Sequence, residues 1–240
     1  MIYLPDVVST EVQLFDLVDG NTERLDAFLN LFCETFPQYA QVAQRLAQKA
    51  ALPANANLDF IAHQWLLEIG QIPAGLCSFK YNPRRNLGLV VFIAVAERFR
   101  RTILENMRLS EWLIYGSIQQ MQEDARSLNR PSPDGLILEV EPLRLVERYR
   151  QFGFVTLPVD YWEPLYLHPR QGVAGPTDLS QVQFSSRFLG AFPVGNRPVA
   201  VNSPAFCKRV LSMLAFDHYH IPEEHWSIQK AFQSIAWMRE

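Results

Sequence analysis

Residues 135–154, GLILEVEPLRLVERYRQFGF, are the stretch from which the fold of this chain can be worked out. They follow the turn-forming sequence PSPDG and begin with an apolar, β-branched run up to Glu141, which predicts a strand. Pro142 comes next, at the position of a first helical residue. Proline is tolerated there because the N–H that it lacks would have no hydrogen-bond acceptor within the helix. Apolar residues with helical spacing follow, and Gly153 predicts the end of the helix. The stretch is therefore predicted to be a strand followed directly by a short helix.

The last six residues, Tyr149-Arg150-Gln151-Phe152-Gly153-Phe154, resemble the close of the last strand–helix unit in the GNAT acyl-CoA N-acyltransferase superfamily. In that family a tyrosine and three variable residues precede Gly-Phe. The family usually has an asparagine seven residues before the tyrosine and a small residue at the next turn, where this chain has Pro142 and Leu145. The alternative is that the six residues are simply a helix end with a hydrophobic contact, which any α/β protein can use.

Apolar residues elsewhere in the chain recur with the spacing of strands and helices. They predict a strand at 12–18, a helix pair broken at Pro37, strands at 64–69, 75–81 and 87–95, a helix at 103–128, the strand and helix of 135–154, and a strand at 162–167. This order matches the layout of the GNAT superfamily. The resemblance therefore implies an α/β fold with a mixed, mostly antiparallel sheet flanked by helices, in which 87–95 is the fourth strand.

The C-terminal part lies beyond that resemblance. Residues 180–198 mix polar residues with glycine and proline and are predicted to be irregular, and two helices follow, one from Ser203-Pro204 to about 219 and one from about 222 to the end. We therefore expect a GNAT-like acyltransferase domain at 1–170 and a C-terminal extension at 171–240. The aromatic residues of the extension need burial: they pack on their own domain, or they form a dimer arm that makes a homodimer, or a lid over the substrate groove.

Composition excludes several classes of protein. The 240 residues are 48% hydrophobic with a net charge of −3, which suits a globular domain and argues against a nucleic-acid partner. No apolar run is long enough to span a membrane, and the N-terminus does not have the pattern of a signal peptide. The three cysteines, Cys33, Cys77 and Cys207, are predicted to be buried thiols in a reducing compartment, and the cytoplasm is the expected location.

The resemblance also implies a reaction. A GNAT-like enzyme moves an acyl group, acetyl in the first instance, from acyl-CoA to a small-molecule or peptide amine by direct attack. In this chain the backbone of Ile93 and Val95 would align the thioester, and Tyr149 would protonate the departing thiolate, for which a phenol has a suitable pKa. Glu141 and Glu97 are the candidate bases, because each follows a strand that borders the expected cleft.

Two weaker candidate bases are Glu139 and Glu68. Each carboxylate is also interpretable as an ordinary exposed side chain, since spacing alone shows no shifted pKa. Tyr149 has an alternative role too, as a core tyrosine whose hydroxyl reaches a backbone carbonyl.

The expected phosphate-binding turn departs from the family pattern. The family has Gln/Arg-x-x-Gly-x-Gly/Ala after its fourth strand, so that backbone N–H groups at a helix start bind the pyrophosphate. Aligning Arg100 with the first basic residue puts Ile103 and Glu105 at the glycine positions. Aligning Arg108 puts Glu111 and Leu113 there, so neither alignment restores a glycine.

Three interpretations of the turn remain open. Arg98, Arg100, Arg101 and Thr102 hold the phosphates of an acyl-CoA by charge, or the phosphate site has decayed, or the arginines are an ordinary solvated loop. With a decayed site the chain would be a catalytically silent GNAT-fold module that binds a partner or a small ligand. A third function keeps the chemistry but takes its acyl group from a carrier protein or as a long chain.

No metal site and no serine hydrolase site is predicted. His218, His220 and His225 fit no tight ligand spacing, and the chain has no Gly-x-Ser-x-Gly sequence.

Overall fold

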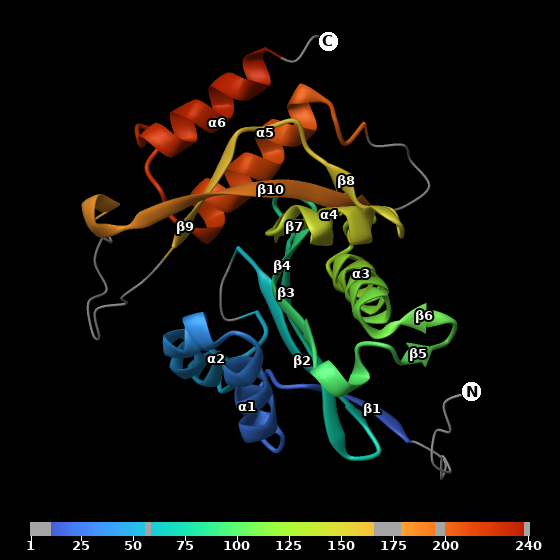
Figure 1. Cartoon of the computed structure of the whole chain (residues 1–240). Coiled ribbons are helices and arrows are strands. Elements are labelled where there is room, and N and C mark those ends of the chain that lie inside the picture. The colour runs from blue at the N-terminus through green and yellow to red at the C-terminus, as the bar shows by residue number, and fades with distance from the viewer. Residues whose placement is uncertain (1–10, 56–58, 166–178, 195–199, 238–240) are drawn as a thin grey trace. The chain divides into compact units, whose positions relative to one another are not determined.

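The computed structural model describes residues 11–55, 59–165, 179–194 and 200–237. Its strands form a mixed, mostly antiparallel sheet with the order β1-β2-β3-β4-β7-β10-β8, and β9 pairs with β10 beside this path (Figure 1). The chain divides into two compact units. The first comprises the described residues up to 55 with Ala62–Phe79 and Phe92–Ser117, and the second comprises Lys80–Val91, residues 59–61 and the described residues from Ile118 onward.

The first unit holds the N-terminal helices and the first strands. Its elements are β1 Val12–Asp16, α1 Leu25–Thr35, the 3-10 helix η1 Pro37–Val42, α2 Ala43–Ala50, most of β2 Ile61–Ile69 and β3 Ile72–Asn82, the end of β4 Leu87–Val95, η2 Glu97–Phe99, β5 Ile103–Leu104, β6 Met107–Arg108 and the first half of α3 Leu109–Ser127. Pro37 opens η1, as predicted, and separates it from α1. Phe28, Phe32 and Leu46 of the helices pack with Leu66 and Leu76 of the strands in one apolar cluster.

The turn between β2 and β3 is shorter than the sequence predicts. Gly70 and Gln71 both have positive φ, 59° and 63°, which is the backbone conformation of a two-residue hairpin turn. Ile72 and Pro73, which lie between the predicted strands 64–69 and 75–81, therefore belong to β3.

The predicted helix at 103–128 begins six residues late. Glu105 and Asn106 both have positive φ, 51° and 66°, and make a second tight turn that pairs β5 with β6. Ile103 lies on this hairpin and is 59% exposed, so its helical spacing to the later residues is coincidental. From Leu109 to Ser127 the predicted helix is confirmed, and Ile114, Met121 and Ala125 are buried along one side of α3, whereas Leu128 lies after its end and is 44% exposed.

The second unit holds the rest of the chain. Its elements are the first part of β4, the second half of α3, β7 Gly135–Val140, α4 Leu143–Arg150, β8 Val155–Thr156, β9 Tyr161–Leu165, η3 Leu179–Gln181, β10 Gln183–Pro193, α5 Pro204–Ser212, the π-helix η4 Met213–His218 and α6 Trp226–Ala236. The strand and helix predicted for 135–154 are confirmed, with Pro142 as the N-cap of α4 and not its first residue. Leu87–Val90 of β4 pair in parallel with Gly135–Leu138 of β7.

The prediction that 180–198 is irregular was wrong for the described residues. Gln183–Pro193 form the eleven-residue strand β10, which pairs antiparallel with β9, β7 and β8. Glycine made this segment resemble a loop, but Gly190 is needed for packing. A Cβ added there would lie 2.3 Å from Phe154 Cζ and 2.6 Å from the Val155 carbonyl oxygen.

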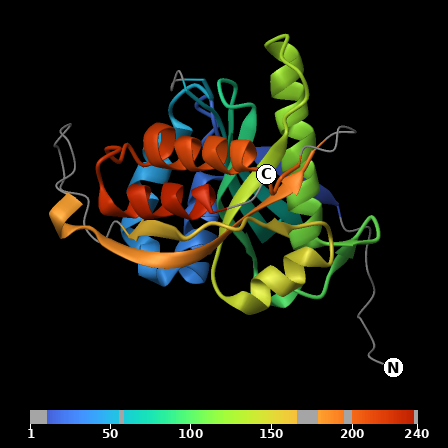
Figure 2. The same cartoon turned by 90° about the horizontal axis from the view of Figure 1, so that it is seen from above.

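The two C-terminal helices pack on their own unit. Ser203 caps α5 by accepting a hydrogen bond from the Phe206 N–H, as its sequence predicts. Figures 1 and 2 show α5 and α6 side by side. Their buried residues share one cluster with β4, β7 and β10, and this cluster includes Val210, Leu214, Ala231, Ile235, Leu89, Ile137 and Leu189. The predicted domain boundary at residue 170 lies outside the described residues.

We expect Gly190→Ala to lower the free energy of unfolding by about 2 kcal/mol, because overpacking a filled site costs on the order of 1–3 kcal/mol. Chemical denaturation would measure it. Ser186→Ala, on the exposed side of the same strand, is the control and should change the free energy by less than about 0.5 kcal/mol. A neutral Gly190→Ala would show that β10 does not approach Phe154 as described.

Candidate functional site

Tyr149 lies in the last turn of α4 and is 8% exposed. Its ring contacts Phe152, Phe154 and Phe192 at centroid distances of 5.5, 5.9 and 6.2 Å. Gly153 has φ +102°, a conformation that ends the helix, and the Phe154 N–H then returns to the Tyr149 carbonyl at 3.1 Å. The sequence Tyr-x-x-x-Gly-Phe is therefore a helix end with a hydrophobic contact, and this contact also holds the tyrosine ring in place.

Glu139 is the centre of a polar cluster in the second unit. It stands on β7, and its carboxylate accepts a short hydrogen bond from the Tyr161 hydroxyl of β9. The Tyr219 hydroxyl, just after η4, lies 2.8 Å from Glu139 Oε2 and 3.1 Å from Oε1. Residues 22 and 80 positions away in the sequence thus converge on one carboxylate.

The surroundings of Glu139 change its acidity. Burial, followed by the negative charge of Glu163, raises the pKa of Glu139 to about 8. The hydrogen bonds from Tyr161 and Tyr219 and the charge of Arg187 act in the opposite direction but do not cancel the effect of burial. Burial, followed by the Glu139 charge, raises the pKa of both tyrosines well above the usual value, so both remain protonated donors. A carboxyl group that titrates near neutral pH can exchange a proton with a reacting amine.

Arg187 joins Glu139's neighbours into one network. Its Nε lies 2.6 Å from Glu163 Oε2 and its Nη1 lies 2.8 Å from Glu141 Oε2. The Arg187 side chain is 7% exposed, whereas that of Glu141 is 62% exposed. The candidate base Glu141 is thus held in an ion pair at the rim of the cluster, and Glu139 lies deeper. Sequence spacing ranked these two carboxylates the other way, because the tyrosines that surround Glu139 are not its sequence neighbours.

The other candidate bases lie in the first unit. Glu97 is exposed in η2. Glu68 is 3% exposed on β2, with Oε1 3.5 Å from Arg24 Nε, and its Oε2 is buried with no hydrogen-bond partner among the described residues. Among the described residues, no hydrogen bond from a tyrosine, histidine or serine reaches either carboxylate.

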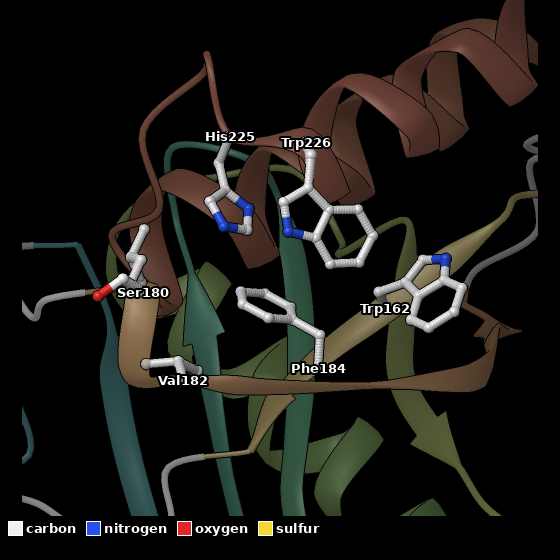
Figure 3. Close-up of a pocket in the computed structure, with 7 residues that line it drawn as sticks. Trp162, Ser180, Val182, Phe184, His225 and Trp226 are labelled. Carbon is white, nitrogen blue, oxygen red and sulfur yellow. The ribbon is translucent and has the colours of Figure 1, made fainter.

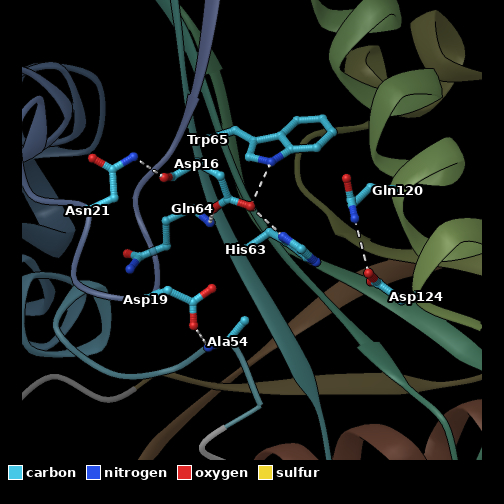
Figure 4. A network of polar contacts seen from close by, with 9 residues as sticks. All are labelled: Asp16, Asp19, Asn21, Ala54, His63, Gln64, Trp65, Gln120 and Asp124. Carbon is cyan, nitrogen blue, oxygen red and sulfur yellow. Dashed lines mark hydrogen bonds and ion pairs between the residues drawn. The ribbon is translucent and has the colours of Figure 1, made fainter. Parts of the chain in front are cut away.

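A second polar network in the first unit is structural (Figure 4). Asp16 Oδ2 of β1 lies 2.5 Å from His63 Nδ1 and 3.2 Å from the Trp65 indole nitrogen, and Asp16 Oδ1 accepts the Gln64 backbone N–H at 3.1 Å. His63 is 6% exposed and stacks on Phe79 at 4.8 Å. These contacts fix the end of β1 against β2.

The loop arginines of the first unit precede the helix that they were expected to open. Arg98, Arg100 and Arg101 are exposed between β4 and the β5–β6 hairpin, and the Arg98 guanidinium lies 5.0 Å from the Phe99 ring centroid. Because α3 begins at Leu109, the alignment on Arg108 is the one that matches the helix start. That start carries Glu111 in its first turn and has no glycine in that turn.

Even-numbered residues of β4 face α3 at the start of the strand, and odd-numbered residues face it at the end. A Cβ added to Gly88 would lie 1.7 Å from Met121 Sδ of α3. At the other end, a Cβ added to Gly75 of β3 would lie 3.1 Å from Leu113 Cδ1 of α3 and 3.9 Å from Val95 Cγ2. The alternation therefore shifts by one residue between Gly88 and Val95, as a β-bulge would cause. A bulge between these two residues would leave backbone groups off the regular ladder.

The element order completes the picture. Strands β4 and β7 pair in parallel, whereas β1 with β2 and β10 with β7, β8 and β9 pair antiparallel. Helix α3 lies between β4 and β7 in the chain, and α4 with Tyr149 follows β7 directly. The chain has a GNAT-like fold. No protein-family model matches the chain, and no curated protein matches its sequence.

The solved structures similar to this chain include three acetyltransferases, each with a TM-score below 0.5. A Bacillus subtilis acetyltransferase in complex with CoA is 15% identical, with a TM-score of 0.45 over 78% of this chain and 99% of that one. The ribosomal-protein-S18-alanine N-acetyltransferase of Escherichia coli is 13% identical, with a TM-score of 0.46 over 79% and 97%. A putative GNAT-family acetyltransferase of Bacteroides thetaiotaomicron is 15% identical, with a TM-score of 0.47 over 88% and 99%.

Two other findings concern metals and membranes. Among the described residues no group of three or more His, Cys, Asp and Glu side chains is placed to hold a metal ion. Two of the histidines have other contacts: His218 Nδ1 lies 2.8 Å from Lys80 Nζ, and His225 caps α6. In the described part of the GNAT-like chain, no helix combines the length and the apolar character needed to cross a bilayer.

We expect Glu139→Gln to flatten the pH dependence of stability. Folding raises the pKa of this carboxyl group from 4.5 to about 8, so between these values the folded chain holds a proton that the unfolded chain releases. The free energy of unfolding of the native protein should therefore fall as pH rises through that window, and the variant should lose this part of the slope.

Urea denaturation at several pH values measures both slopes. Glu147→Gln, which changes an exposed carboxylate on α4, is the matched control and should keep the native slope. An unchanged slope in Glu139→Gln would contradict the burial assigned to Glu139.

Proposed function

We propose that this GNAT-like chain transfers an acyl group from acyl-CoA to an amine by direct attack on the thioester. The observation that carries the proposal is the parallel pair β4 and β7 followed at once by α4 and Tyr149. Paired residues span Leu87–Val90 and Gly135–Leu138, and both strands continue beyond them. In GNAT-like folds the pantetheine arm enters where these two strands part. Acetyl-CoA is the first donor to test.

The first unit would bind the donor. Backbone groups of Ile93 and Val95 would pair with the amides of the pantetheine arm, and the shifted alternation of β4 supports this by taking the strand off its regular ladder. Arg98, Arg100, Arg101 and Thr102 would meet the phosphates. Their charges would then replace the glycine backbone that other members of this fold present.

The second unit would supply the acid and the base. The amine nitrogen attacks the thioester carbonyl, a C–N bond forms, the C–S bond breaks, and the sulfur leaves as a thiolate. Glu139, with a pKa of about 8, would take the proton that the ammonium loses, directly or through water. Tyr149 would give its hydroxyl proton to the thiolate. Glu141 and Glu97 remain alternative bases.

A second function is favoured by one observation. Glu111 in the first turn of α3, with Leu113 after it, opposes a pyrophosphate at the helix start. This supports a catalytically silent module that binds a partner or a small ligand. It equally supports a donor without a free nucleotide, such as an acylated carrier protein or a long acyl chain.

Titration calorimetry with acetyl-CoA and with free CoA tests the donor site. We expect micromolar binding, on the order of 8 kcal/mol, if the arginines replace the missing glycines. The double variant Arg100→Ala with Arg101→Ala should weaken that binding by about tenfold or more, because two charge-assisted phosphate contacts are lost. Arg126→Ala, an exposed arginine in the last turn of α3, is the control.

The outcomes separate the proposals. Native affinity in the double variant would reject the arginine assignment. No binding of acetyl-CoA at millimolar concentration would reject CoA-dependent transfer and favour the silent module or the carrier-protein donor.

We expect Tyr149→Phe to lower kcat by about 100-fold, since loss of a general acid costs on the order of 10²–10⁴ in rate. Thiol release with the first amine that supports turnover would measure it. The phenyl ring keeps the contacts with Phe152, Phe154 and Phe192, so the melting temperature should change little. Tyr115→Phe, at a more exposed tyrosine of α3, is the control. Full activity in Tyr149→Phe would leave this residue with only a packing role.

A further inference from the structure

A pocket of about 500 Å³ lies in the second unit, where the β9–β10 ribbon meets the start of α6 (Figure 3). Its lining residues are Trp162, Leu179, Ser180, Val182, Phe184, His225 and Trp226. None of them belongs to the residues proposed for acyl transfer. The inference drawn from this pocket is therefore independent of the proposed function.

Aromatic rings form its walls. The Trp226 ring lies 5.4 Å from Trp162, at an interplanar angle of 69°, and 5.4 Å from Phe184, at 66°. His225 stacks on Phe184 at 4.7 Å and 27°. Trp226 nevertheless remains 49% exposed, so a large apolar face in a concave site still meets water. Such a face gains most from a flat apolar partner that lies against it.

Two N–H groups point toward the same space. His225 Nδ1 accepts the Ser227 backbone N–H at 3.4 Å as the cap of α6 and lies 2.8 Å from Ser227 Oγ. With Nδ1 as the acceptor in both contacts, Nε2 carries the proton of the neutral ring, and burial lowers the pKa of His225. Figure 3 shows the His225 ring reaching from the start of α6 toward Phe184, with the Trp226 indole nitrogen on the side of its ring that faces His225. Within the described part of the chain, no hydrogen bond uses Trp226 Nε1 or His225 Nε2.

The charged side chain described at the pocket wall is a cation. The lining residues that the structure describes include no aspartate and no glutamate. Lys230 Nζ lies 4.7 Å from the centroid of the Trp162 ring, so a positive charge already stands at one wall. A ligand with an acceptor group would meet two donors and this ammonium, whereas a cationic ligand would meet repulsion.

We propose that this pocket binds a planar aromatic carboxylate. The flat ring of the ligand lies against Trp162, Phe184 and Trp226, and its carboxylate accepts hydrogen bonds from His225 Nε2–H and Trp226 Nε1–H.

Calorimetric titration of the full chain with three size-matched probes tests the proposal. They are 2-naphthoate, its saturated analogue decahydronaphthalene-2-carboxylate, and 2-naphthylmethylammonium. We expect 2-naphthoate to bind at least about tenfold more tightly than either of the others. The saturated probe keeps the charge and loses the flat ring, and the ammonium keeps the ring and reverses the charge.

Two variants locate the binding. Trp226→Phe removes one donor and keeps an aromatic ring, and His225→Asn removes the imidazole and keeps a side chain that caps helices. Each variant should lower the affinity for 2-naphthoate by about tenfold, which corresponds to the loss of one hydrogen bond to a charged group. Trp237→Phe, at a tryptophan that is 85% exposed outside the pocket, should bind as the native protein does.

Three results would each overturn the proposal. They are equal affinity for the saturated or the cationic probe, native affinity in both pocket variants, and no saturable binding of 2-naphthoate at millimolar concentration.

Discussion

The backbone pairing of β10 is the constraint on which the second unit depends. Its first half, Gln183–Arg187, pairs with β9, and its second half, Phe188–Pro193, pairs with β7. This register puts Arg187 opposite Tyr161 and near Glu141, so one strand brings Tyr161 and Glu163 of β9 to the carboxylates of β7. It also requires Gly190, since no side chain fits beside Phe154. A shift of one residue would turn Arg187 to the other face and break up the cluster.

In the cluster at Glu139, burial and hydrogen bonding shift the pKa of the carboxyl group in opposite directions. Burial makes the carboxylate form costly and raises its pKa to about 8, while the hydroxyls of Tyr161 and Tyr219 keep the ionised form accessible. The same two tyrosines also hold the carboxyl group in one orientation. A group with this acidity in a fixed position is suited to proton transfer at neutral pH, which is why Glu139 takes precedence over Glu141 as the proposed base.

The proposed donor binding in the first unit would depend on charge and not on backbone geometry. The β5–β6 hairpin moves the start of α3 to Leu109 and separates it from the arginines that follow β4. A helix start with an acidic first turn binds a pyrophosphate more weakly than a helix start whose glycines leave the backbone N–H groups accessible. Guanidinium groups on a loop can compensate by charge, but they lack the fixed geometry of backbone N–H groups. Acyl-CoA affinity is therefore the property on which the proposed activity rests.

The sequence by itself determined the elements whose signals are local. Apolar spacing predicted β4, α1 and the β7–α4 stretch, Ser203 predicted the start of α5, and the element order predicted the GNAT-like layout. The sequence-based prediction was wrong at 103–108 because two residues with positive φ form a hairpin there and delay the start of the helix. It was wrong at 183–193 because a glycine required for packing made a strand look like a loop. Only the tertiary structure decided which carboxylate is buried and which rings line the pocket. Burial and convergence join residues far apart in the chain, and no local pattern records them.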